Sequence, residues 1–201
     1  MPGWFFDSSA LAKRYHPEPG TERVDEIISG ARNRICISRL TLIEMRSVFA
    51  IKARAGAIAS ADTQLFAGRF QEDIALGRFD VFAIGEREFA RAEDLLERHA
   101  LDRRLRSLDA IQLSVAIGLW HHGGIEYFVA SDRVLCDVAA REGTGHGAVM
   151  LANVLRSPVA VRVSIQAVRA FVNLRRMLVL APPPAPPKRP IGFIPPGSGK
   201  K

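Results

Sequence analysis

The chain has 201 residues, 48% of them hydrophobic and 24% charged, a balance that excludes wholesale disorder and a collagen-like or coiled-coil chain. The formal net charge of +7 is concentrated at one end, because eight of the 28 Lys and Arg residues lie in 158–201, which contains no Asp or Glu. Residues 1–157 carry 20 Lys and Arg against 21 Asp and Glu, so their charge alone does not indicate a nucleic-acid-binding surface.

Strands and helices predicted from periodicity and capping signals alternate along the chain. They are, in order, a strand at 4–6, a short helix at 7–15, a helix at 21–30, a strand at 34–37, helices at 40–54 and 61–76, a strand at 79–82, helices at 86–100 and 108–120, a strand at 126–130 and a helix at 132–141. Along the 40–54 helix, Leu40, Ile43, Ser47 and Ala50 recur at turn spacing. This alternation predicts an α/β fold with a mostly parallel sheet and helices on both faces.

The composition changes near residue 158, after which nine of the twelve prolines occur. We therefore expect one folded domain in 1–152, with a last strand at 148–151, and a basic, Pro- and Gly-rich, partly disordered extension in 153–201. Cys36 and Cys136 form no CxxC pair and are predicted to be buried thiols in a reducing cytoplasm. A signal peptide is not predicted, because Asp7 follows after only six residues and no basic region precedes a long apolar run. A membrane span is not predicted either, because the apolar stretch 159–181 contains four arginines.

Four acidic residues are candidates for a catalytic centre. Asp7 and Asp132 follow predicted strands, and in parallel α/β sheets ligands bind at the carboxyl ends of strands. Glu44 lies in the helix after the second strand, and Asp109 lies in the first turn of the most apolar helix. A buried carboxylate needs a partner, and a shared Mg²⁺ or Mn²⁺ ion would supply one and would activate water near a scissile phosphate.

Each of these acids also has a purely structural interpretation. Asp7 and Asp132 are well placed to cap helices, Asp109 to complement a helix dipole, and Glu44 to be an exposed helix residue. A phosphoacceptor site on Asp7 is a further alternative, although no second acid stands beside it in the sequence. Spacing alone does not bring the four acids together.

The segments around the four acids resemble the motifs of PIN-domain ribonucleases, in particular VapC-type toxins of toxin–antitoxin modules. They read FDSSALAKRY at 6–15, SRLTLIEMRS at 38–47, SLDAIQL at 107–113 and VASDRVL at 129–135. The four motifs occur in the family's order, and the match extends from about residue 4 to residue 143. The sequence departs from the family pattern after residue 143, where some fifty further residues follow.

The resemblance implies a three-layer α/β/α PIN-like fold and a Mg²⁺- or Mn²⁺-dependent endoribonuclease that cleaves tRNA or rRNA. It assigns the catalytic and metal-binding roles to Asp7, Glu44, Asp109 and Asp132, with Ser131 and Ser8 as accessory polar groups. It also implies a homodimer and a cognate VapB-like antitoxin.

Basic residues near the motifs are candidates for contact with RNA phosphates, namely Lys13, Arg14, Arg46 and Arg106. The alternative to an enzyme is a catalytically weak PIN-like module that binds RNA or an antitoxin.

Overall fold

The computed structural model describes residues 1–143 and places four parallel strands at the centre of the molecule. The strand order is β3-β2-β1-β4, with β1 at Gly3–Phe6, β2 at Arg34–Ser38, β3 at Asp80–Phe82 and β4 at Tyr127–Val129. The chain places β2 on one side of β1 and β4 on the other, so the direction of winding changes between β1 and β4. Such a change leaves a crevice at the carboxyl ends of the two strands.

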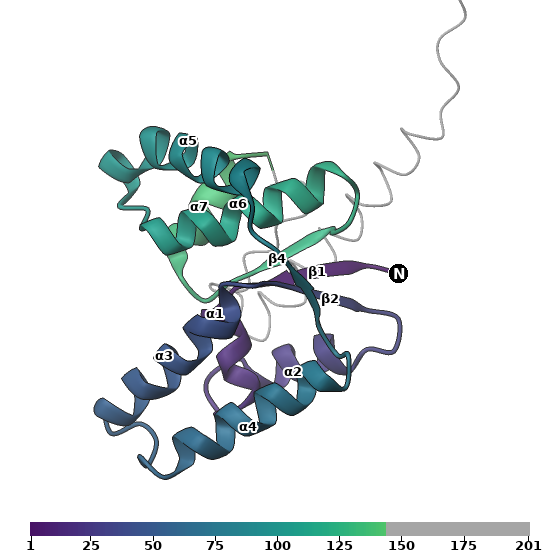
Figure 1. Cartoon of the computed structure of the whole chain (residues 1–201), viewed down its shortest axis with the longest axis vertical. Coiled ribbons are helices and arrows are strands. Elements are labelled where there is room, and N and C mark those ends of the chain that lie inside the picture. Colours follow the sequence, from purple (N-terminus) through teal and green to yellow (C-terminus); the bar gives the residue numbers. More distant parts are fainter. Residues whose placement is uncertain (144–201) are drawn as a thin grey trace, which may run out of the picture.

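Helices cover both faces of the sheet, which confirms the predicted three-layer α/β/α arrangement (Figure 1). One face carries α1 (Ser8–Leu11), a 3₁₀ turn at Ala12–Arg14, α2 (Thr21–Ser29), α3 (Thr41–Arg54) and α4 (Asp62–Ala75). The opposite face carries α5 (Glu86–Arg103), α6 (Ser107–His121) and α7 (Arg133–Arg141).

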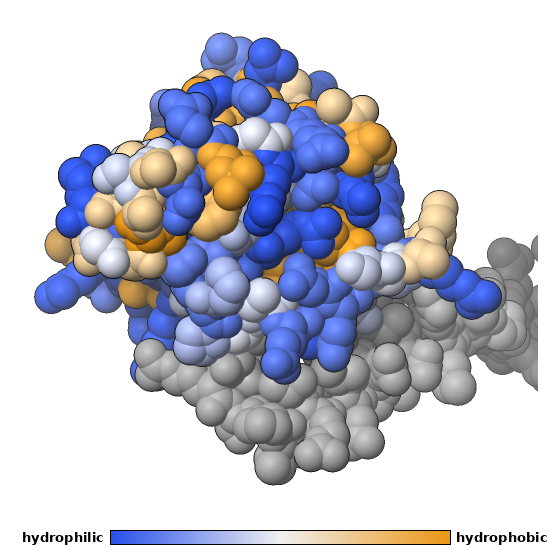
Figure 2. Space-filling view, turned by 90° about the horizontal axis from the view of Figure 1, so that it is seen from below, coloured by the Kyte–Doolittle hydropathy of each residue, from blue (hydrophilic) through white to orange (hydrophobic). Residues whose placement is uncertain are grey.

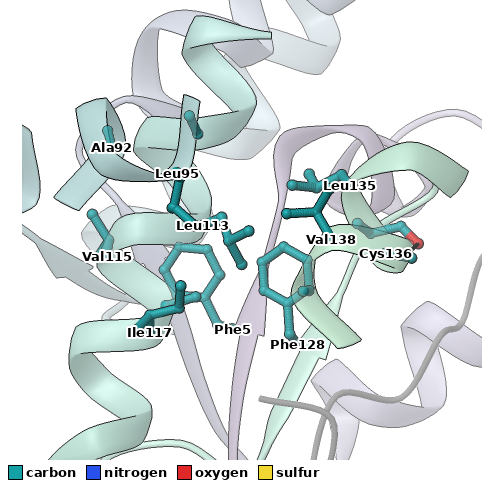
Figure 3. Close-up of a cluster of buried hydrophobic side chains, with 14 of the residues drawn as sticks. Phe5, Ala92, Leu95, Leu113, Val115, Ile117, Phe128, Leu135, Cys136 and Val138 are labelled. Atoms are coloured by element: carbon teal, nitrogen blue, oxygen red, sulfur yellow. Dashed lines mark hydrogen bonds between the residues drawn. The ribbon is translucent and has the colours of Figure 1, made fainter. Parts of the chain in front are cut away.

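Two hydrophobic cores lie on the two sides of the sheet, because successive strand residues point to opposite faces. Phe6 belongs to the core under α1–α4, together with Met45 and Phe49 of α3. Phe5 belongs to the core under α5–α7, where its ring stacks on Phe128 with centroids 5.8 Å apart (Figure 3). Both Phe5 and Phe6 are completely buried, so β1 contributes to both cores, as β2 and β4 also do.

The amino end of the sheet is closed by backbone packed against backbone. A Cβ atom added at Gly3 would come within 2.3 Å of the carbonyl oxygen of Gly124. The Glu126 N–H donates to the Gly3 carbonyl at 2.9 Å, and the Gly3 N–H donates to the Glu126 carboxylate. A side chain at position 3 would therefore separate the starts of β1 and β4.

The buried side of α3 differs from the turn-spaced set seen in the sequence. Thr41, Met45 and Phe49 are buried, whereas Ile43 is 68% exposed. The helix carries apolar residues on two faces, and the packing of α4 and β2 decides which face is covered. The predicted helix at 7–15 is also divided, since it changes from α-helical to 3₁₀ geometry at Ala12.

Further predictions concern the cysteines, membrane spans and the end of the chain. Both cysteines are buried, as predicted, and neither forms a disulfide within residues 1–143. Within residues 1–143 no helix is long and apolar enough to cross a membrane. In the view from below, apolar residues stand in separate places among hydrophilic ones (Figure 2). The predicted strand at 148–151, the domain boundary at 152 and the extension 153–201 lie outside the described residues.

Candidate functional site

Asp7 occupies the point where β1 ends and α1 begins. Its Oδ2 accepts hydrogen bonds from the backbone N–H of Ser9 at 3.0 Å and from the Ser9 hydroxyl, so Asp7 caps α1. Asp7 is only 3% exposed, and burial raises the pKa of its carboxyl group, while the Ser9 hydrogen bonds lower it and the charge of Asp132 raises it further. The capping interpretation of Asp7 is therefore correct, yet the cap leaves a buried carboxyl group near a second acid.

Ser9 also fastens β1 to the segment after β4. Its hydroxyl accepts a hydrogen bond from the backbone N–H of Ser131 at 3.0 Å, while the Asp7 backbone N–H donates to the Val129 carbonyl at 2.9 Å. The Ser131 hydroxyl oxygen is buried and has no hydrogen-bond partner among the described residues. Ser131 directly precedes Asp132, so this unpaired buried hydroxyl is a polar group of the same segment that calls for an explanation.

Asp132 caps α7 with one carboxylate oxygen. Its Oδ1 accepts a hydrogen bond from the backbone N–H of Leu135 at 2.9 Å, as the capping interpretation predicted. Within residues 1–143 no hydrogen bond to its other oxygen is seen. Leu135 and Cys136, in the first turn of α7, are buried in the core, and their packing holds this end of the helix in place.

Glu44 lies in the first turn of α3 and is half-buried. Its Oε2 accepts a hydrogen bond from Nε2 of Gln112 at 2.5 Å. Burial raises the pKa of Glu44, the Gln112 hydrogen bond lowers it, the charge of Asp7 raises it, and a hydrogen bond from the Ser8 side chain lowers it. The side chain of the predicted accessory residue Ser8 is thus connected to Glu44, while the serine hydroxyl that donates to Asp7 is that of Ser9.

Asp109 lies in the first turn of α6, directly after the loop that contains Arg106. Burial raises the pKa of Asp109 to about 6, and the charges of Asp7, Asp132 and Glu44 contribute to the rise. The guanidinium group of the exposed Arg106 acts in the opposite direction. Arg106 therefore lies close enough to the acids to attract an anionic ligand towards them.

The structure brings the four predicted acids within electrostatic range of one another at the carboxyl edge of the sheet. Asp7 interacts with the other three, and Asp109 interacts with both Glu44 and Asp132. Four carboxyl groups match a hard divalent cation by donor chemistry. As the side chains stand, however, no three His, Cys, Asp or Glu residues of the part described are grouped so that they could hold a metal ion.

Three other basic candidates lie away from this centre. Lys13 is buried and donates to Glu18 at 3.0 Å, and Arg14 donates to Asp73 at 2.8 Å and to Asp25 at 3.3 Å. These ion pairs stabilise the α1–α4 side of the domain and occupy the charged ends of both side chains. Arg46 is exposed and lines a groove between α3 and α4.

Sequence reasoning missed two residues that hold the acids in place, Ser9 and Gln112. A hydroxyl two residues after a capping aspartate is a usual hydrogen-bond donor to that aspartate, and this pattern is visible at Ser9. Gln112 is the polar residue that interrupts an apolar helix one turn after Asp109, which is also visible in the sequence. Its partners come from other elements and are not visible there.

The fold and the acidic edge together define a class, an α/β domain with an acidic centre at the carboxyl ends of parallel strands. Residues 4–141 match the PIN domain family, and the chain belongs to that family. PIN domains are generally nucleases that use divalent metals and bind RNA.

One solved structure to which the chain is similar is the crystal structure of PAE2754 from Pyrobaculum aerophilum. The two chains are 19% identical, with a TM-score of 0.47, and the similarity covers 77% of this chain and 93% of that chain. No curated protein matches the sequence.

Proposed function

We propose that this PIN-domain protein is a Mg²⁺- or Mn²⁺-dependent endoribonuclease of the VapC toxin type, which cleaves tRNA or rRNA in the cytoplasm. The observation that carries the proposal is the mutual interaction of four carboxyl groups at one edge of the sheet. Three of them, Asp7, Glu44 and Asp109, have raised pKa values, and the cation that acts on Asp109, Arg106, is exposed. Uncompensated acids of this kind are typical of functional sites rather than of structural ion pairs.

The four acids have different roles in this proposal. Asp7 and Asp109 are the candidates for direct metal ligands, because each of them interacts electrostatically with the other three acids. Glu44 either ligates the metal or accepts the proton of the attacking water, and Asp132 holds a second ion or its water shell. A divalent cation bound here would supply a lowered water pKa and a positive charge opposite the scissile phosphate.

The remaining groups of the site bind and orient the substrate. Arg106 attracts the phosphate that is to be cleaved, in a position beside Asp109. The unpaired hydroxyl of Ser131 donates to a phosphate oxygen or to a ligand water. Ser9 keeps Asp7 and the segment after β4 together, so that the acids on β1 and α7 keep a fixed separation.

The partners belong to the same proposal. The groove between α3 and α4 has a volume of about 290 Å³ and is lined mainly by apolar side chains, including Met45, Phe49 and Phe70. Ile43 of α3 and Leu65 of α4 are further apolar residues of these two helices that are exposed. Apolar surface of this kind supports an interface, as a homodimer and as a binding site for a VapB-like antitoxin requires.

Cleavage of a mixed pool of tRNA and short single-stranded RNA tests the proposed activity. The purified protein is assayed with Mg²⁺, with Mn²⁺ and with EDTA, beside Asp7→Asn and Asp109→Asn. We expect metal-dependent cleavage that falls at least about 100-fold in both variants, the scale of losing a group that acts in the transition state. Asp102→Asn, which removes an exposed acid at the end of α5, is the matched control and keeps full activity.

A different result would favour the binding module. A folded wild-type protein that retains RNA without turnover in Mg²⁺ and in Mn²⁺ would contradict the nuclease proposal. Cleavage that persists in Asp7→Asn and Asp109→Asn would instead show that the activity belongs to another site or to a contaminant.

A further inference from the structure

Gln112 is a buried amide in an otherwise apolar part of α6. It is completely buried, and its neighbours Leu113, Val115 and Ala116 belong to the core under α5–α7. A primary amide in such a position is costly unless each of its polar atoms is hydrogen-bonded. Gln112 follows Asp109 by three residues, so the two side chains lie on the same face of the helix.

The polar atoms of Gln112 are bound to three side chains. Nε2 donates to Oε2 of Glu44 at 2.5 Å and to Oγ1 of Thr41 at 3.0 Å. Oε1 accepts from the hydroxyl of Ser38 at 2.7 Å. Rotation of the amide by half a turn would direct its carbonyl oxygen at the Glu44 carboxylate, so these contacts fix the amide in one orientation.

The anchors of the amide are themselves buried and connected. Ser38 and Thr41 are completely buried, and the backbone N–H of Thr41 donates to the Ser38 hydroxyl at 3.3 Å. Ser38 is the last residue of β2 and Thr41 the first of α3, so the amide joins the carboxyl edge of the sheet to the turn of α3 that carries Glu44. Through Gln112, α6 with Asp109 and α3 with Glu44 are linked across the two helical layers.

We propose that Gln112 is a positioning residue for the acidic centre, which holds the Glu44 carboxylate at a fixed place relative to Asp109. This inference rests on the proposed nuclease function and adds to it a residue that acts through Glu44 and not by contact with metal or RNA. Groups that orient ligands in this way strengthen metal binding, and their loss weakens it about 10- to 100-fold.

A double-mutant cycle on Mn²⁺ binding tests the proposal. Gln112→Met keeps the length and approximate volume of the side chain but removes the donor, and it is measured alone and combined with Glu44→Ala. Isothermal titration with MnCl₂ gives the affinities, and cleavage assays give kcat and KM. We expect Gln112→Met to weaken Mn²⁺ binding about 10-fold or more in the wild-type background and to have no effect when Glu44 is already Ala.

Ser114→Ala is the matched control. Ser114 is also completely buried on α6, but its hydroxyl donates to the Ile111 carbonyl of its own helix, so its removal leaves Mn²⁺ binding unchanged. If Gln112→Met does not fold, as judged by circular dichroism, Ser38→Ala takes its place in the cycle. That variant removes the anchor of Oε1 and leaves the amide present.

The outcomes separate the two proposals. Wild-type binding of Mn²⁺ together with unchanged binding in Gln112→Met overturns the positioning role alone. An equal loss in the Glu44→Ala background also overturns it, because Gln112 would then act on the fold. A wild-type protein that neither binds Mn²⁺ nor cleaves RNA overturns the proposed function and this inference with it.

Discussion

Two regions of the domain bury carboxyl groups in opposite ways. On the α1–α4 side, Asp73 of α4 accepts hydrogen bonds from Nε of Arg14 at 2.8 Å and from the hydroxyl of Tyr15 at 2.9 Å, and Nε of Arg78 lies 3.0 Å from its other oxygen. At the carboxyl edge of the sheet, Asp7 is as deeply buried but receives neutral donors from Ser9 and faces further acids.

The difference separates a structural acid from acids kept for chemistry. A buried charge that is paired and fully hydrogen-bonded is tolerated, whereas unpaired charges of one sign oppose folding. Asp73 is paired with two guanidinium groups, those of Arg14 and Arg78. The acidic centre at the carboxyl edge of the sheet has no such pairing among the described residues. We infer that the acidic centre lowers the stability of the metal-free protein and that the paired region does not.

The largest change in the free energy of unfolding is expected when the ion pairs of Asp73 on the α1–α4 side are removed. Asp73→Ala leaves Arg14 and Tyr15 without their buried partner, and we expect the free energy of unfolding to fall by about 3–5 kcal/mol in urea denaturation. Asp25→Ala removes the more exposed partner of Arg14 and is expected to cost less than about 1 kcal/mol. Equal losses in the two variants would contradict the importance of burial.

In the acidic centre we expect the opposite effect, a rise in the free energy of unfolding when one acid is removed. Asp7→Asn keeps a good helix cap, because Asn caps as well as Asp, and it removes one of the mutually repelling charges. We expect a gain of about 1 kcal/mol in the free energy of unfolding, measured in EDTA at pH 7. Clear destabilisation of this variant would show that the negative charge of Asp7 stabilises the fold, which would contradict the inference that the acidic centre lowers the stability of the metal-free protein.

The last and smallest effect is a change, caused by Asp109, in how the free energy of unfolding depends on pH. Its pKa is about 6 in the folded protein against an ordinary value of 3.8, so the folded state binds the proton more tightly. The destabilising contribution of Asp109 is complete above pH 6 and disappears as the pH falls towards 4.

Urea denaturation in EDTA between pH 7 and pH 4 measures this dependence. Asp109→Asn should gain stability over the wild type at pH 7, and the gain should shrink at lower pH. A gain that is independent of pH would contradict the assignment, since Asp109 would then titrate outside this range.

The fold was largely predictable because its determinants are local. Alternating periodicity gave the order of strands and helices, and the rule that parallel strands carry ligands at their carboxyl ends singled out Asp7 and Asp132. Glu44 and Asp109 were also candidates from their places in helices, but grouping them with Asp7 and Asp132 required the resemblance to the PIN-domain family, since the two acids lie on helices from different layers. The family and the fold are confirmed, whereas the metal-binding roles stay predictions.

The parts that the sequence did not predict depend on contacts between distant residues. Arg14 meets Asp73 across 59 positions, and Gln112 meets Glu44 across 68. Neither pair is encoded by spacing along one helix, so a basic residue near a motif was not distinguishable from one committed to an ion pair. The buried face of α3 depended in the same way on α4, which covers Met45 and Phe49 and not Ile43.

The glycine contact that closes the amino end of the sheet makes the two ends of β1 unequal. At Asp7, directly after the carboxyl end of β1, a substitution changes the charge and chemistry of the acidic centre. At the amino end, any side chain on residue 3 would collide with the Gly124 carbonyl. Such a substitution would therefore lower the fraction of molecules that fold correctly. Variants at Gly3 and at Asp7, which flank the same short strand, would therefore look alike in a cell-based screen for lost function, while per folded molecule only the Asp7 variants would be defective.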